Sequence, residues 1–89
     1  MIGEQDKARI VELGKRYQAS RVLLFGSSVA LDREGEDIDL AVEGVPPSLF
    51  FEFYGQLICS LSKPVDLVDL GEKSRLTEMI LREGMLLYG

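Results

Sequence analysis

Three aspartates in two segments of the sequence could bind a divalent cation. Asp37 and Asp39 form an Asp-Ile-Asp unit, and Asp66 lies further along, between Val and Leu. In an extended strand residues i and i+2 share a face, so Asp37 and Asp39 project side by side. Two neighbouring carboxylates repel, and Mg²⁺ relieves that repulsion by binding their oxygens together with substrate phosphates. Asp66 from a neighbouring strand would bind a second metal or take the proton of an attacking hydroxyl, as in phosphoryl or nucleotidyl transfer.

A Gly-Ser turn after an apolar run could hold the phosphates of such a substrate. Gly26 and Ser27 directly follow the run 22–25. Glycine lets the backbone approach a phosphate closely, and the hydroxyl and N–H of Ser27 are donors at a strand-to-helix turn. Each signal is common by itself, because Asp-x-Asp occurs in many exposed strands and Ser27 suits an N-cap equally well. The order of the segments along the chain is what favours a site.

The elements that must position these residues follow from the spacing of the apolar side chains. Helical and alternating patterns divide the chain into a helix over 4–17, a strand over 21–25, a polar turn over 27–36, a strand over 37–43, a helix around 50–61, a strand over 64–70, a helix over 74–83 and an extended end over 85–88. We therefore predict the fold class α/β (α+β), with a small mixed sheet of three to four strands flanked by helices in the order α-β-β-α-β-α. Residues 1–89 are expected to form a single domain.

Several expectations concern which side chains face the core. The helices over 50–61 and 74–83 should turn apolar stripes inward, comprising respectively Phe50, Phe53, Tyr54, Leu57, Ile58 and Leu61, and Leu76, Met79 and Ile80. We expect Cys59 to be a small core or boundary residue without a reactive role. Phe51 is either exposed as a protein contact or packed. Asp69 alternates to the face opposite Asp66, which places it outside the site.

Composition restricts the chemistry to carboxylates. The 89 residues include no His and one Cys, which excludes a Ser-His-Asp triad, a Cys/His dyad, a His or Cys zinc site and a disulfide framework. The net charge of −5 is confined to residues 32–43, because the acids and bases elsewhere balance. An acidic domain without a basic stripe argues against binding DNA or RNA. No membrane span or signal peptide is apparent, so we expect a cytoplasmic protein without membrane association.

Four short segments together resemble a known family. They are Leu24–Ser27, Asp37–Leu40, Val65–Val68 and the closing Arg82–Tyr88. In this order they resemble the minimal nucleotidyltransferase (MNT) domains of the DNA polymerase beta superfamily. The resemblance covers nearly the whole chain and implies a nucleotidyltransferase palm-like fold.

The resemblance also implies roles for individual residues. The catalytic triad that binds Mg²⁺ would be Asp37, Asp39 and Asp66. The candidate positions for binding the phosphates of ATP are Gly26, Ser27, Ser28 and Arg33. Ser28 stands where family members often carry Arg, and Glu36 stands where they often carry Ser, and both differences weaken anion binding. Arg33 would compensate, or would instead pair with Glu34 or Glu36 in solvent.

The family resemblance finally implies a partner. Such small proteins are typically encoded beside a helical HEPN-domain toxin, and the MNT antitoxin transfers AMP from ATP to a tyrosine of that toxin. The first hypothesis is therefore a Mg²⁺-dependent protein adenylyltransferase of a toxin–antitoxin pair. Ser28 and Glu36 motivate the alternative of a catalytically degenerate module that neutralises its partner by occlusion. A third hypothesis is nucleotide transfer to a small molecule, for which a homo-oligomer or hetero-oligomer would have to supply the acceptor pocket.

Overall fold

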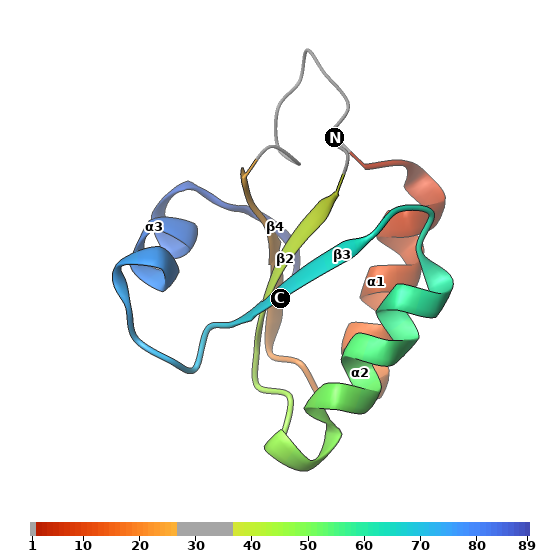
Figure 1. Ribbon diagram of the computed structural model, residues 1–89, viewed down its shortest axis with the longest axis horizontal. Helices are drawn as coiled ribbons and strands as arrows, with labels where there is room; N and C mark the ends of the chain where they lie inside the picture. The colour runs from red at the N-terminus through yellow and green to blue at the C-terminus, as the bar shows by residue number, and fades with distance from the viewer. Residues whose placement is uncertain (1, 27–36) are drawn as a thin grey trace.

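A four-stranded mixed sheet organises the computed structural model, which describes residues 2–26 and 37–89 (Figure 1). The elements are α1 (Glu4–Arg16), β1 (Arg21–Leu24), β2 (Ile38–Glu43), α2 (Pro47–Ser60), β3 (Val65–Asp69), α3 (Arg75–Glu83) and β4 (Met85–Tyr88). In the strand order β3-β2-β1-β4, β1 pairs antiparallel with β2 and with β4, whereas β2 and β3 are parallel. The predicted element order and mixed sheet are confirmed, and the extended end is the fourth strand.

The helices cover the two faces of the sheet unequally. α1 and α2 lie on one face and the shorter α3 on the other (Figure 1). The larger core cluster joins α1 and α2 to the alternate β2 residues Ile38, Leu40 and Val42. The smaller cluster, under α3, comprises Leu23, Ala41, Leu70 and Ile80. β2 is therefore buried on both faces along most of its length, and only its start and its end carry acidic side chains. None of the helices in these two described stretches is long and apolar enough to cross a membrane.

Local signals set the helix boundaries. Pro47 occupies the first turn of α2, where the absence of an N–H leaves no hydrogen bond unmade. Ser74 and Thr77 form a capping box at the start of α3, each side chain accepting from the backbone N–H of the other. Gly84 ends α3, and a Cβ there would come within 2.6 Å of the carbonyl oxygen of Ile80. Glycine is needed at this position because the chain turns sharply into β4.

Two residues predicted to face inward lie in solvent instead, and the placement predicted for Cys59 is also wrong. Ile58 is 54% exposed, Leu76 is 45% exposed, and Cys59 is exposed beside Ile58. A helix that packs on a sheet buries only a stripe of its surface, and the fully buried Phe53 and Leu57 already define that stripe in α2. Ile58 and Cys59 follow on the turning helix surface and face away from the core. Phe51 is 82% exposed and therefore does not pack in the core, and its role as a protein contact stays a prediction.

Candidate active site

The register of the parallel strand pair brings two of the predicted aspartates together. Asp39 of β2 lies directly opposite Asp66 of β3. Residues paired in this way project from the same face of a sheet. That face is the one covered by α3 further along, where Ala41 follows Asp39 and Val68 follows Asp66 at an interval of two residues. Both carboxylates therefore stand at the starts of their strands, beyond the apolar layer under α3.

The pKa of Asp39 is raised by its surroundings. Burial is the main cause that raises this pKa above its ordinary value of 3.8, and the negative charges of Asp66 and Asp37 raise it further. Asp39 is half-buried, whereas Asp37 and Asp66 are exposed. The structure thus pairs Asp39 with Asp66, and Asp37 directly precedes β2, while the role of the three aspartates as a metal site stays a prediction.

Gly26 lies against the central carboxylate of this group. The N–H of Phe25 donates to the backbone oxygen of Asp39 at 3.0 Å, which places the end of β1 beside the start of β2. Gly26 follows with φ of 65°, and a Cβ at this position would stand 2.6 Å from Oδ2 of Asp39. Only glycine combines this left-handed backbone with such close approach. Gly26, which was predicted to belong to the site, thus lies next to Asp39.

Sequence comparison decides the family. A sequence model for the family described as "Polymerase beta, Nucleotidyltransferase" matches residues 8–89. The chain belongs to this nucleotidyltransferase family. The resemblance read from the four short segments is confirmed, and the matched region contains Gly26 together with all three aspartates. No curated protein sequence matches the chain significantly.

Solved structures similar to this nucleotidyltransferase come from toxin–antitoxin complexes. One is a toxin–antitoxin crystal structure with AMP-PNP, where the matched chain has 28% identity and a TM-score of 0.74, over 93% of this chain and 73% of that one. A second, the MntA–HepT toxin–antitoxin, has 25% identity and a TM-score of 0.73 over 98% and 73% of the two chains. A third is a tri-AMPylated Shewanella oneidensis HEPN toxin in complex with an MNT antitoxin, with 27% identity and a TM-score of 0.71 over 94% and 70%.

The donor set of this nucleotidyltransferase fits Mg²⁺. Carboxylate oxygens are the ligands that Mg²⁺ prefers, and a bound cation would offset both the burial and the neighbouring negative charges that raise the pKa of Asp39. Among the described residues, no three acidic or thiol side chains are already grouped closely enough to hold a metal ion. Mg²⁺ commonly takes one or two carboxylates and completes its shell with water and substrate phosphates.

The remaining predicted nucleotide ligands lie in one segment. Ser27, Ser28 and Arg33 fall within residues 27–36, outside the described part of the chain, and so does Glu36. Their predicted roles stay predictions. Gly26, directly before residues 27–36, and Asp37, directly after them, are both described.

Two other acidic residues have structural roles. Asp69 is paired with Val42, a residue of the α1–α2 face, so its side chain points away from Asp66 as predicted. Its Oδ1 accepts from the N–H of Gly71 at 2.8 Å and stabilises the turn after β3. Glu43 accepts from Nε of Arg21 at 3.0 Å, and this hydrogen bond is the main cause that lowers the pKa of Glu43. The pairing of Arg21 with Glu43 across β1 and β2 was not predicted, because it depends on the strand register.

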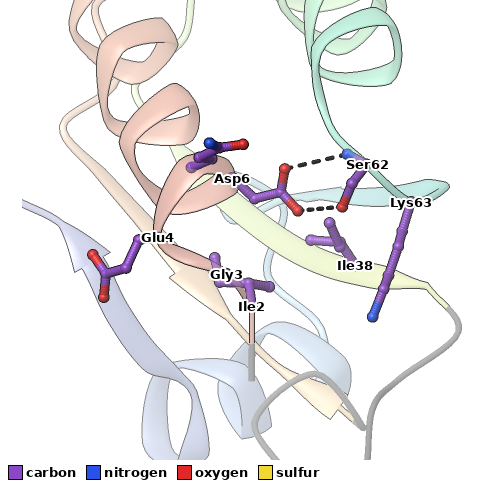
Figure 2. A pocket seen from close by; sticks show the side chains of 8 residues that line it. Ile2, Gly3, Glu4, Asp6, Ile38, Ser62 and Lys63 are labelled. Atoms are coloured by element: carbon purple, nitrogen blue, oxygen red, sulfur yellow. Dashed lines mark hydrogen bonds between the residues drawn. The ribbon is translucent and has the colours of Figure 1, made fainter.

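A surface cavity of about 430 Å³ lies on the other side of β2 (Figure 2). Its wall comprises the first turn of α1 with Ile2, the side chain of Ile38, and Ser62 and Lys63 before β3. Ser62 donates from its backbone N–H and its hydroxyl to the carboxylate of Asp6, which joins α1 to this loop (Figure 2). Ile38 alternates with the aspartates along β2, so the cavity opens on the opposite face, and none of the three aspartates lines it.

Proposed function

We propose that this nucleotidyltransferase uses Mg²⁺ to transfer AMP from ATP to a hydroxyl of a HEPN-domain partner, and that it is the antitoxin of such a pair. The observation that carries the proposal is the pairing of Asp39 with Asp66 on one face, with Gly26 packed against Asp39. Solved relatives with AMP-PNP and with a tri-AMPylated HEPN toxin support the choice of nucleotide and acceptor.

Each residue has a defined task in this reaction. Asp37 and Asp39, with Asp66 as a further ligand, would hold Mg²⁺, which supplies charge stabilisation for the triphosphate when bound. Asp66 accepts the proton of the acceptor hydroxyl, whose oxygen forms a bond to the α-phosphorus while the bond from that phosphorus to the pyrophosphate oxygen breaks. Pyrophosphate leaves with the bonding electron pair. Gly26 lets the backbone after β1 lie close to the phosphates, because no side chain separates it from Asp39.

Transfer of radiolabel tests the proposal directly. The chain is incubated with α-labelled ATP, Mg²⁺ and a HEPN-domain protein encoded beside it, and label on the HEPN protein is measured. We expect Asp39→Asn to abolish the transfer and Asp69→Asn to retain it, since Asp69 is an exposed aspartate on the opposite face of β3. The amide oxygen introduced by Asp69→Asn would still accept from the N–H of Gly71, so this control keeps the turn intact. Equal labelling by the wild type and Asp39→Asn would refute the catalytic role.

Growth rescue separates catalysis from occlusion. If neutralisation of the toxin requires transfer, cells that express the HEPN protein with the double variant Asp37→Asn/Asp39→Asn will fail to grow. Asp37 is exposed and Asp39 half-buried, so the isosteric changes leave the fold intact. Full neutralisation by this variant, with the HEPN protein unlabelled, would show that the chain acts as a binding module and not as an enzyme.

A further inference from the structure

A tyrosine on α2 is bonded to the strand that carries Asp66. The hydroxyl of Tyr54 donates to the carbonyl oxygen of Val65 at 3.0 Å. β3 is an edge strand, paired with β2 on one side only. The N–H of Ile38 in β2 donates to the carbonyl of Pro64 at 2.8 Å, and successive carbonyls along a strand point to opposite edges. The carbonyl of Val65 therefore points to the open edge, where Tyr54 supplies the partner that a further strand would otherwise provide.

The bonded carbonyl belongs to the peptide group that joins Val65 to Asp66. Because the peptide group is planar, a hydrogen bond to its oxygen also restrains the backbone nitrogen of Asp66. The other restraint on this backbone is the pairing with β2, in which Asp66 lies opposite Asp39. Tyr54 and β2 thus hold the start of β3 from its two edges. A strand held from one edge alone would fray most easily at its first residues, where Asp66 is located.

The choice of tyrosine over phenylalanine points to the hydroxyl. The aromatic residues of α2 are Phe50, Phe51, Phe53 and Tyr54. The ring of Tyr54 packs on the same core cluster as Phe50, a contact that phenylalanine makes equally well. Among the described residues, what the hydroxyl adds to this half-buried ring is the hydrogen bond to Val65. Core packing therefore accounts for an aromatic ring at position 54, and the hydrogen bond to the backbone of β3 accounts for its hydroxyl group.

We propose that Tyr54 is a positioning residue, which holds Asp66 opposite Asp39 through its hydrogen bond to the carbonyl of Val65. The inference rests on the proposed function, because Asp66 is the group that receives the acceptor proton or binds metal. Tyr54 itself contacts neither nucleotide nor acceptor in this scheme. It acts through the backbone of the preceding residue.

A pair of matched variants tests the assignment. Tyr54→Phe removes the bond to β3, and Tyr17→Phe removes a comparable bond from a tyrosine hydroxyl to Glu52 at 2.7 Å, between α1 and α2. The first readout is kcat/KM for AMP transfer to the HEPN partner. The second is binding of Mn²⁺ in the presence of AMP-PNP, followed by electron paramagnetic resonance. We expect Tyr54→Phe to lower kcat/KM about fivefold, the rate equivalent of one net hydrogen bond, and to weaken Mn²⁺ binding. Tyr17→Phe will leave both readouts unchanged.

A double-variant cycle distinguishes positioning of Asp66 from general loosening of the fold. In an Asp66→Asn background, Tyr54→Phe is expected to cause no further loss, because the group that it positions is already absent. Full additivity of the two losses, or equal effects of Tyr54→Phe and Tyr17→Phe, would overturn the proposal. Absence of transfer by the wild type would instead refute the proposed function, and the Mn²⁺ measurement would still decide whether Tyr54 positions Asp66.

Discussion

Replacement of Gly26 by alanine should remove activity while the fold remains. The new Cβ would stand 2.6 Å from Oδ2 of Asp39, whereas ordinary contact begins at 3.4 Å, so the carboxylate must move by at least 0.8 Å. The carboxylate is the end of a flexible side chain, so it yields more easily than the backbone. The left-handed φ of 65° adds a penalty of about 1–2 kcal/mol for a residue with a Cβ. A misplacement of about 1 Å can cost about 100-fold in rate, and we expect a loss of that size.

Two other glycines provide the controls for Gly26→Ala. At Gly84 a Cβ would meet the backbone oxygen of Ile80 at 2.6 Å, so Gly84→Ala should destabilise the fold without touching Asp39. At Gly55, inside α2, no atom lies within 4 Å of the added Cβ, and Gly55→Ala should stabilise the protein by about 0.5–1 kcal/mol. Labelled transfer and thermal denaturation are measured for all three. The reasoning fails if folded Gly26→Ala transfers AMP at the wild-type rate, or if Gly84→Ala loses as much activity at temperatures where it is folded.

Three further predictions concern charge and capping. Burial raises the pKa of Asp39, so ionisation of this carboxylate opposes folding, and the free energy of unfolding falls as the pH rises through and above 3.8. Asp39→Asn should therefore raise the Tm at neutral pH, and this gain should vanish at lower pH. The hydrogen bond from Arg21 lowers the pKa of Glu43, so the pair stabilises the fold above pH 4.5, and this stabilisation is lost as the pH falls through the lowered pKa. Glu43→Gln should cost at most about 1 kcal/mol of stability at neutral pH, because the pair is exposed to solvent. The variant should also reduce the loss of stability in acid and leave AMP transfer unchanged. Ser74→Ala removes the side-chain cap that accepts from Thr77, and should lower the Tm by about 4–8 °C for a loss of about 1 kcal/mol, measured by circular dichroism.

Local patterns predicted the elements of the fold because each pattern reports one element at a time. Alternation along β2 places Ile38 in the core and Asp39 on the other face without reference to any partner strand. The spacing of apolar residues could not predict how wide a stripe of each helix surface is buried, because that width depends on the shape of the sheet on which the helix packs. Ile58 and Leu76 therefore continue the helical pattern but lie in solvent.

The sequence predicted that the segments of the candidate site converge, but it could not give the individual contacts, because these join residues far apart in the chain. The positions of Gly26 and Asp39 were both predicted to matter, but their approach depends on the pairing of β1 with β2. The opposition of Asp39 and Asp66 depends on the register of a parallel pair connected through α2. Tyr54 has no signal in the sequence beyond its place in an apolar stripe, since its hydroxyl bonds to a backbone carbonyl.

The acidic residues at the two ends of β2 differ in the environment of their charges. At the end of β2, Glu43 is held by Arg21 and by the hydroxyl of Ser20, and its lowered pKa reflects stabilisation of the charged form. At the start of β2, Asp39 is half-buried near two further carboxylates, and its pKa is raised because the charged form is disfavoured. Under the proposed function, Mg²⁺ and the substrate phosphates would bind at the start of β2 and offset the cost of burying the charge of Asp39, whereas the charge of Glu43 serves the stability of the sheet.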